Sequence, residues 1–345
     1  MANPTGFTHI PLVDISGLRS GDPLVRAQTA EAMGKAAREV GFLYVTGHGI
    51  PAHLTDGVKA AAQSFFAQPF DEKMKVFIGK SRNHRGYVPE GEEQFYGSKV
   101  DRKEAYDLSI DLPADDPDYL AGNPMLGPNQ WPEVPGFSEA VGAYYEAAFA
   151  VCRNMLSAFA LALGEPADAF EAMITKPPSQ LRLVHYPFNP DAADAPGIGE
   201  HTDYELFTLL MVTAPGLEVM NGDGVWIDAP PVAEAFVVNI GDMLEILSDG
   251  AFIATAHRVR KVAEERYSFP LFFTVDYHTH IAPLPRFVKP GTTPRAPLIA
   301  GEHVFAQTAQ SFKYLRARLE RGEITLPEAS RPYGSFVRKQ AGEEA

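Results

Sequence analysis

The chain has 345 residues, of which 45% are hydrophobic and 21% are charged. These values are typical of a folded globular protein with a large core, and they exclude the collagen-like, coiled-coil and disordered classes. The 30 Lys and Arg residues are outnumbered by 44 Asp and Glu residues, so the formal net charge is −14. Because this charge repels nucleic-acid phosphates and anionic lipids, we expect neither nucleic acid nor a membrane as a partner.

The single cysteine, Cys152, excludes an internal disulfide and a cysteine-rich metal site. It lies in the apolar run Ala147–Cys152, so we predict a buried structural thiol. The first ten residues contain neither a basic leader nor the apolar stretch of a signal peptide. No run approaches the length of a membrane span. Cytoplasmic localisation is therefore the default expectation.

The first half of the chain shows mainly helical spacing of apolar residues. A β-like run comes first, and a glycine suited to end the first helix stands at Gly41. Two irregular stretches interrupt the pattern, one of them a loop rich in Gly and Glu. In chain order, we predict a strand at Ile10–Asp14, a helix at Leu24–Val40, a strand at Phe42–Val45, a helix at His53–Phe66, a loop at Asn83–Gly97, an irregular crossing at Leu112–Pro135 and a long helix at Ser138–Leu163.

Beyond Pro177 the sequence changes to short apolar or alternating runs separated by Gly, Pro, Asn and Asp. Runs of this kind are typical of an all-β sandwich or barrel. The tail returns to a helical pattern at Phe305–Arg321, followed by a polar end after Arg338. The predicted strands are Gln180–Tyr186, Phe207–Val212, Leu217–Met220, Phe236–Ile240, Ala254–Val259 and Tyr267–Val275.

Three residues of the second half form a candidate metal site. His201 and Asp203 stand at i and i+2, so an extended segment turns both side chains to the same face. A third ligand, His257, lies on a later predicted strand. Two imidazoles and one carboxylate that leave other positions open are typical of oxygen-activating ferrous iron. With ten histidines in the chain, however, an isolated His-x-Asp pattern decides nothing by itself.

A second pair at i and i+2, Arg266 and Ser268, follows His257 on an apolar predicted strand. A guanidinium that faces the inside of a barrel is costly without an anionic partner, because an unpaired buried charge is heavily penalised. A dicarboxylate ligand would supply that partner.

The order of these motifs resembles the isopenicillin N synthase-like branch of the Fe(II)/2-oxoglutarate-dependent oxygenases, over almost the whole chain. Each motif is weak alone, and the ordered set is specific. The matching segments are Ile10–Asp14, Gly41–Ile50, Arg85–Tyr87, Lys103–Glu104, Gly127–Pro132, Leu181–Arg182, Tyr186–Pro187, His201–Asp203, Val238–Asp242, His257–Val259 and Arg266–Ser268.

The resemblance implies a mainly β core with surrounding helices, the double-stranded β-helix or jelly roll of cupin-like type. It implies an N-terminal region at 1–120 whose helices pack on the core, a crossing segment and long helix at 121–176, a jelly-roll core at 177–285 and a helical tail at 286–345. His201, Asp203 and His257 correspond to the catalytic iron ligands. Arg266 and Ser268 correspond to the pair that binds the distal carboxylate of 2-oxoglutarate.

Other matching residues allow more than one role. Tyr186 corresponds to a tyrosine that touches the co-substrate or the substrate carboxylate, and the alternative is an aromatic residue of the core. Val184 stands where many plant relatives carry Asn, which leaves co-substrate contact there open. His48 we interpret as part of a structural turn, and Asn239 and Asp242 as residues that shape the turn after a strand.

Candidate substrate contacts come from the front loop and from the residue after Asp203. Relatives place substrate-binding groups near Arg85 and Tyr87, although a surface Arg85 paired with the Glu90–Glu93 cluster is equally plausible. Aromatic residues could line the mouth of the site. The candidates are Phe95, Tyr96 and Tyr204.

The implied reaction is oxidative decarboxylation of 2-oxoglutarate with O2, coupled to hydroxylation, desaturation or cyclisation of a small amino acid, peptide or natural-product intermediate. Four alternatives stay open: an oxidase of the same fold that does not use 2-oxoglutarate, an ethylene-forming enzyme, a jelly-roll binding protein without catalysis, and a zinc hydrolase on the same ligands. The sequence leaves the substrate and the oligomeric state undetermined.

Overall fold

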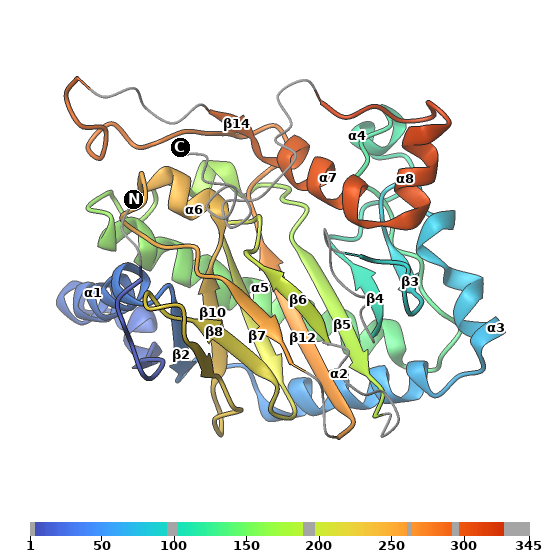
Figure 1. Cartoon of the computed structure of the whole chain (residues 1–345), viewed down its shortest axis with the longest axis horizontal. Helices are drawn as coiled ribbons and strands as arrows, with labels where there is room; N and C mark the ends of the chain where they lie inside the picture. The colour runs from blue at the N-terminus through green and yellow to red at the C-terminus, as the bar shows by residue number, and fades with distance from the viewer. Residues whose placement is uncertain (1–3, 95–102, 189–196, 261–263, 292–296, 328–345) are drawn as a thin grey trace.

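The structure is a computed structural model, and it describes residues 4–94, 103–188, 197–260, 264–291 and 297–327 (Figure 1). Of the predicted elements, the polar end after Arg338 lies outside these ranges, as do the candidate contacts Phe95 and Tyr96. None of the helices in the described ranges combines the length and the apolar character that a membrane span requires.

A large sheet is the main element of the fold. Its strands are β1 (Leu12–Asp14), β2 (Phe42–Thr46), β3 (Gly86–Val88), β4 (Glu104–Leu108), β5 (Gln180–Tyr186), β7 (Phe207–Val212), β10 (Phe236–Ile240) and β12 (Arg266–Phe273). They are ordered β1-β2-β10-β7-β12-β5-β4-β3. The β1–β2 pair is parallel, and the other neighbours are antiparallel. Strands from both halves of the chain therefore share one sheet.

A smaller sheet supplies the second layer. Its strands are β6 (Ile198–His201), β8 (Leu217–Met220), β9 (Trp226–Asp228) and β11 (His257–Val259), and a separate pair is formed by β13 (His280–Ile281) and β14 (Leu298–Ile299). The order in the smaller sheet is β6-β11-β8-β9. Together the two sheets form the expected double-stranded β-helix, so the predicted fold class is confirmed.

Helices surround the sheets. They are α1 (Pro23–Glu39), α2 (Ala52–Phe66), α3 (Phe70–Lys73), α4 (Pro117–Leu120), α5 (Phe137–Ala162), α6 (Asp242–Leu247), α7 (Ala300–Ser311) and α8 (Lys313–Glu320), with 3-10 turns at Ser16–Arg19, Met74–Val76, Ile78–Lys80 and Glu171–Met173. Helix α5 lies at the centre of the layer behind the large sheet, because α1 and α2 pack on it and it packs on β12.

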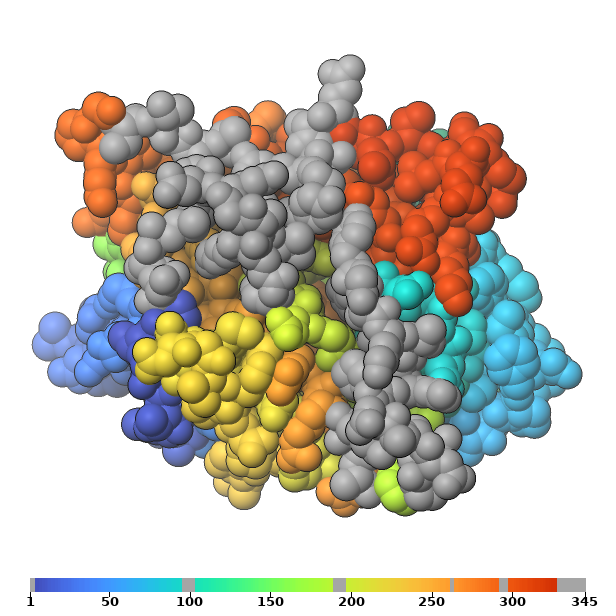
Figure 2. All heavy atoms as spheres, viewed as in Figure 1, coloured from blue at the N-terminus to red at the C-terminus, as the bar shows by residue number. Residues whose placement is uncertain are grey.

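The C-terminal helices form a group of their own. In Figure 1, α7 and α8 lie together, apart from the layer that contains α1, α2 and α5. The space-filling view in Figure 2 shows them as one continuous red area of the surface, next to the blue and cyan segments of the N-terminal region. The C-terminal helices thus lie beside the part of the N-terminal region that contains α3, β3 and β4, on the opposite side of this view from α1.

Alternation along β12 separates the core from the interior of the β-helix. Phe269 and Phe273 point to the helical layer, where their rings contact Tyr144 and Phe149 of α5. Arg266 and Ser268 point the other way and line a cavity between the sheets. Side chains of a strand alternate between its two faces, so one strand serves both the core and the site.

Most predicted elements are confirmed, four of the strands with the same bounds. Other predictions were wrong in part, and the irregular crossing predicted at Leu112–Pro135 contains the short helix α4. The loop predicted at Asn83–Gly97 contains β3, and the strand predicted at Ala254–Val259 forms only from His257. The helix predicted at Phe305–Arg321 is two helices, because Phe312 adopts an extended backbone with φ −93° and ψ 130°.

The N-terminal region does more than pack helices on the core, because β1, β2, β3 and β4 extend both edges of the large sheet. The division of the chain at residues 120, 176 and 285 stays a prediction. Cys152 is buried on α5, as expected, and burial raises the pKa of its thiol.

Candidate active site

A cavity between the two sheets contains the predicted site. It encloses about 940 Å³ of empty space, counting its open mouth. The large sheet contributes residues of β5, β7, β10 and β12 to its lining, the smaller sheet residues of β6, β8 and β11, and α7 its last turn. The cavity is thus lined by strands of both sheets and by α7.

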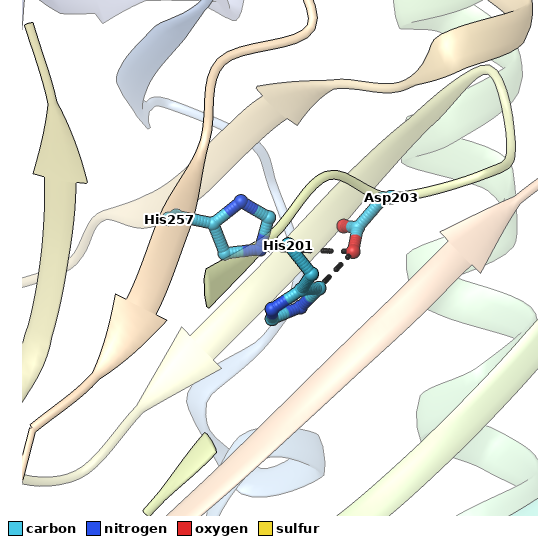
Figure 3. Close-up of side chains that lie close together, drawn as sticks. All are labelled: His201, Asp203 and His257. Carbon is cyan, nitrogen blue, oxygen red and sulfur yellow. Dashed lines mark ion pairs between the residues drawn. The ribbon is translucent and has the colours of Figure 1, made fainter. Parts of the chain in front are cut away.

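His201, Asp203 and His257 meet in this cavity (Figure 3). His201 ends β6 and His257 begins β11, and the antiparallel register places the two residues opposite each other. Asp203 Oδ1 lies 3.7 Å from His201 Nε2 and 3.6 Å from His257 Nε2. One donor atom from each residue lies within 4.8 Å of the others. The strand pairing therefore brings together the three ligands that the sequence predicts.

Hydrogen bonds turn both imidazoles toward the common point. His201 Nδ1 lies 2.8 Å from the carbonyl oxygen of Gly199, and His257 Nδ1 lies 3.2 Å from that of Thr255. A carbonyl accepts only, so each Nδ1 donates and each Nε2 keeps its lone pair. Metal-binding histidines are commonly oriented in this way.

The second oxygen of Asp203 is held by two donors. Thr208 Oγ1 donates to Asp203 Oδ2, and Asn239 Nδ2 donates to the same oxygen over 2.7 Å. These bonds leave Oδ1 directed to the histidines. The interpretation of Asn239 as a turn-shaping residue was therefore wrong, because its side chain orients a ligand. Asp242 does begin the short helix α6 directly after β10, and His48 accepts a bond from the Ile50 N–H within its turn, as expected.

Burial and neighbouring charges prepare these groups for a cation. Burial lowers the pKa of His201, and the charge of His257 lowers it further. Burial by itself would raise the pKa of Asp203, but the His257 and His201 charges and the Thr208 and Asn239 hydrogen bonds lower it. Neutral imidazoles and an ionised carboxylate are the forms that bind a metal ion. Two such imidazoles and one carboxylate fit ferrous iron with open positions.

Arg266 lies in the same cavity, and one of its guanidinium nitrogens has no hydrogen-bond partner in the described part of the chain. Its side chain is 1% exposed, and its Nε donates to the Ala214 carbonyl over 3.2 Å. Its Nη1 has no hydrogen-bond partner among the described residues. The guanidinium carbon lies 4.6 Å from the centre of the Tyr186 ring. A buried cation of this kind calls for an anionic ligand.

The remaining co-substrate candidates lie beside Arg266. Ser268 and Tyr186 line the cavity and are buried, and Tyr186 is the register partner of Arg266 on β5. Val184 also lines the cavity and is the register partner of Ser268. The predicted residues at this end are thus adjacent on two paired strands.

Among the described front-loop candidates, Arg85 and Tyr87 do not line the cavity. Arg85 is 0% exposed, and its nitrogens donate to the carbonyls of Asn83, His84 and Met125. Its suggested pairing with the Glu90–Glu93 cluster at the surface was therefore wrong as well. Tyr87 is buried and donates to Glu104 over 2.6 Å. Tyr204, by contrast, lines the cavity, 6.1 Å from the His303 ring.

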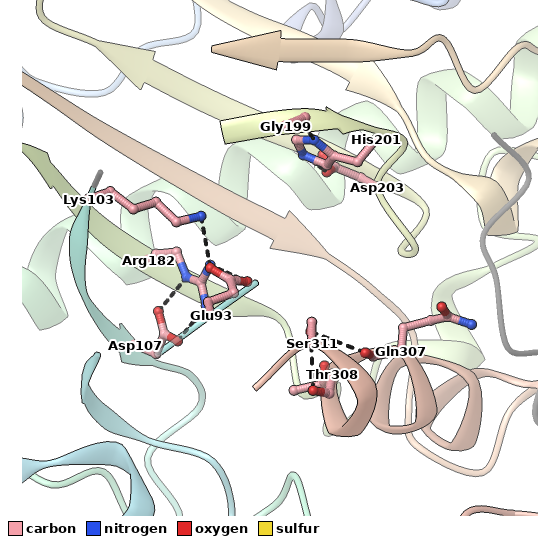
Figure 4. Close-up of polar contacts among 10 residues, drawn as sticks. All are labelled: Glu93, Lys103, Asp107, Arg182, Gly199, His201, Asp203, Gln307, Thr308 and Ser311. Carbon is pink, nitrogen blue, oxygen red and sulfur yellow. Dashed lines mark hydrogen bonds and ion pairs between the residues drawn. The ribbon is translucent and has the colours of Figure 1, made fainter. Parts of the chain in front are cut away.

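A buried charged cluster on the cavity wall had not been assigned a role from the sequence. Arg182 donates to both oxygens of Asp107, over 2.7 and 2.8 Å, and to both oxygens of Glu93 (Figure 4). Lys103 lies 2.8 Å from Glu93. We call these four residues the charged cluster. Its members come from separate segments, so no spacing could have identified it, although Lys103 and Arg182 do stand in motifs that carry the resemblance.

Family comparisons match both halves of the chain. A family described as the non-haem dioxygenase in morphine synthesis N-terminal matches residues 10–134, and the 2OG-Fe(II) oxygenase superfamily matches residues 177–275. Together they span the N-terminal strands and all strands of the cavity.

Individual relatives match over most of their length. The chain is 32% identical to the 2-oxoglutarate-Fe(II) type oxidoreductase hxnY of Emericella nidulans, over 92% of this chain and 94% of that protein. It is 35% identical to the homoarginine-6-hydroxylase 2-ODD-233 of Oryza sativa subsp. japonica, over 89% of this chain and 98% of that protein.

A solved structure supports the same similarity. It is that of a full-length Neurospora crassa protein in complex with alpha-KG, to which this chain is 27% identical. The TM-score is 0.74, over 91% of this chain and 96% of that one.

Proposed function

Because this chain belongs to the 2OG-Fe(II) oxygenase superfamily, we propose that it hydroxylates a small nitrogen-bearing substrate of amino-acid type. The enzyme is a non-haem dioxygenase that uses Fe(II) and 2-oxoglutarate. The observation that carries the proposal is the convergence of the His201, Asp203 and His257 donors in one cavity with an unpaired Arg266 nitrogen.

His201, Asp203 and His257 would hold the iron through Nε2, Oδ1 and Nε2. When bound there, iron supplies the oxidative chemistry that couples decarboxylation of 2-oxoglutarate to attack on a substrate C–H bond. The protein fixes its own ligands beforehand, because the Gly199 and Thr255 carbonyls and the Asn239 amide hold their orientations. Pre-oriented ligands lose less conformational freedom when the ion binds.

Arg266 and Ser268 are the proposed anchor for the distal carboxylate of 2-oxoglutarate. A planar guanidinium matches a carboxylate, and a charge-assisted hydrogen bond is about twice as strong as a neutral one. The unpaired Nη1 supports this role, since the ligand would supply the anion that this buried cation lacks. Tyr186, against which the guanidinium lies, would keep the fork in place and exclude water from it.

Two features support a nitrogen-bearing substrate. A relative with 35% identity is named a homoarginine-6-hydroxylase. In addition, part of the cavity wall carries ionised and hydrogen-bonding side chains, including Glu93, Thr308 and Ser311. Tyr204 is a proposed substrate contact because it follows the ligand Asp203 directly and lines the cavity. A small molecule is the expected partner, and the cytoplasmic location and the lack of nucleic-acid binding stay predictions.

Substrate-dependent succinate formation is the test. The purified enzyme, supplied with Fe(II), O2 and 2-oxoglutarate, is assayed with L-homoarginine, L-arginine, L-lysine and nitrogen-free carboxylic acids of similar length. We expect a nitrogen-bearing compound to raise the rate and to gain one oxygen atom by mass spectrometry. Stimulation only by the nitrogen-free acids would contradict the substrate class, and a product that has lost two hydrogens without gaining oxygen would contradict hydroxylation.

The same assay separates the open alternatives. Turnover without consumption of 2-oxoglutarate would indicate an oxidase, and ethylene in the headspace would indicate an ethylene-forming enzyme. Activity with Zn(II) under anaerobic conditions would indicate a hydrolase.

A further inference from the structure

Glu93 is a buried carboxylate in the wall of the active-site cavity. It is 5% exposed and shares the cavity with the metal ligands. In Figure 4 the charged cluster and the last turn of α7, with Thr308 and Ser311, lie on two sides of the space next to His201 and Asp203. All of these groups line the cavity except Asp107, which lies behind Arg182. A substrate near the iron site would therefore lie within reach of Glu93.

The charged cluster is balanced in charge. Arg182 and Lys103 are cations, and Glu93 and Asp107 are the two acids that they contact. Burial alone would raise the pKa of Glu93, but Arg182 and Lys103 lower it to about 2. Glu93 is thus ionised at neutral pH. A substrate carboxylate placed here would be repelled by the Glu93 carboxylate, because Arg182 and Lys103 already form ion pairs within the charged cluster.

Glu93 keeps capacity to accept another hydrogen bond. Its Oε2 lies 2.8 Å from Arg182 Nη1 and 2.8 Å from Lys103 Nζ. Its Oε1 accepts one bond among the described residues, from Arg182 Nη1 over 3.1 Å. A carboxylate has about four lone-pair positions in all. The remaining position suits an N–H donor.

The backbone holds Glu93 next to an apolar wall. Glu93 forms an antiparallel bridge with Phe312, and the Gln94 N–H donates to the Ser311 carbonyl over 2.9 Å. Phe312 stands at the break between α7 and α8 and lines the cavity. Its ring is held by an edge contact with His84, with centroids 4.6 Å apart, and by the Arg182 guanidinium at 5.5 Å. An ionised acceptor and an apolar ring thus face the cavity from one rigid unit.

We propose that Glu93 determines substrate specificity by binding a protonated nitrogen of the substrate, an amine or a guanidinium, while Phe312 packs against its carbon chain. This inference rests on the proposed function, since it assigns the residue that recognises the nitrogen. At the Glu93 carboxylate itself a cationic group is favoured over an anionic one, because a like charge facing Glu93 is unfavourable. Arg182 and Lys103 hold the acid in place and keep it ionised.

Three probes and one isosteric variant test the inference. L-homoarginine carries an α-amine and a guanidinium, L-homocitrulline replaces the guanidinium with a neutral urea, and 6-guanidinohexanoate lacks the α-amine. Their affinities are measured by calorimetry on the full-length enzyme loaded with Mn(II) and 2-oxoglutarate. We expect L-homoarginine to bind more tightly than at least one of the other two. In Glu93→Gln, the ratio of the affinity for L-homoarginine to the affinity for the weaker-binding probe should fall by about 10- to 100-fold. This factor corresponds to the loss of one hydrogen bond to a charged group.

The matched control is Glu171→Gln. The Glu171 side chain is 42% exposed and pairs with Arg153 outside the cavity. The same chemical change there should leave all three affinities unaltered. An unchanged preference in Glu93→Gln would overturn the role of Glu93 while leaving the proposed function intact. Failure of the unmodified enzyme to bind any probe would contradict the substrate class of the proposed function, and the inference with it.

A second measurement avoids any dependence on the folding of the variant. The crystal structure of the unmodified enzyme with Mn(II), 2-oxoglutarate and L-homoarginine should place a substrate nitrogen about 2.7–3.2 Å from a Glu93 oxygen. A pose in which no substrate nitrogen contacts Glu93 would overturn the inference.

Discussion

The two ends of the cavity handle buried charge in opposite ways. At the Arg266 end, a guanidinium that is 1% exposed has one nitrogen without a partner among the residues that the structure describes. At the charged cluster, Arg182 is bound by two acids, and Glu93 is bound by two cations. A cation left unpaired by the protein requires a ligand of opposite charge, whereas a balanced cluster is complete before the ligand arrives. The Arg266 end is thus suited to bind an anion, and the end with the charged cluster is suited to discriminate among substrates.

The largest expected effect is the loss of Arg182. In Arg182→Met, the buried carboxylate of Asp107 loses both hydrogen bonds that Arg182 donates to it, and Glu93 keeps Lys103 as its cation. Removal of one partner of a buried ion pair costs about 3–5 kcal/mol, so we expect the free energy of unfolding in urea to fall by that amount. Adding Asp107→Asn should recover part of the loss. If Arg182→Met were as stable as the unmodified protein, the ion pairs of the charged cluster would not stabilise the fold, and the contrast with Arg266 would be wrong.

Loss of Arg266 should have the opposite effect on stability. In Arg266→Met, the 2-oxoglutarate-free protein loses a buried charge that has no acidic partner among the described residues, so its free energy of unfolding should stay the same or rise. The dissociation constant for 2-oxoglutarate, measured by calorimetry with Mn(II), should rise by about 100-fold or more, because the charge-assisted bonds are lost. Unchanged affinity for 2-oxoglutarate would show that its distal carboxylate binds elsewhere.

Iron binding should respond less strongly to a change at Asn239. In Asn239→Ala, Asp203 Oδ2 keeps Thr208 as a donor but loses the 2.7 Å bond from the Asn239 amide. Losing such an orienting bond typically weakens metal affinity by about 10- to 100-fold. Competition with a chelator measures the change. Equal iron affinity would indicate that Thr208 alone orients the ligand.

The last expected effect is a pH dependence of stability that comes from the charged cluster. The pKa of Glu93 in the folded protein is about 2, below its unfolded value of about 4.3. A depressed pKa contributes stability above the unfolded pKa, and this contribution is lost as the pH falls from about 4.3 toward 2. Glu93→Gln should therefore show a shallower loss of stability across this window, by at most about 1.4 kcal/mol per pH unit. Identical slopes in urea titrations would contradict this contribution.

Sequence patterns predicted the elements that carry strong local signals. Strands such as Gln180–Tyr186 and Phe207–Val212 are confirmed with unchanged bounds, because each is a largely apolar run between turn residues. Short strands with mixed composition, such as Gly86–Val88 and Ile198–His201, were missed. Their pairing is stabilised by neighbouring strands and not by their own residue preferences. The break at Phe312 was missed for the same reason, since its extended backbone pairs with Glu93.

The site, like the fold, has parts that the sequence predicted and parts that only the tertiary structure revealed. The sequence by itself identified His201, Asp203, His257 and Arg266 as site residues, because the order of the motifs that contain them resembles that of the family. Only the tertiary structure decided which buried charges have partners. In the structure, Asn239 donates a hydrogen bond that orients Asp203, and Arg85 binds backbone carbonyls outside the cavity. Glu93 lies in the cavity wall, where Arg182 binds it. Such outcomes depend on contacts between residues far apart in the chain, and no local pattern records them.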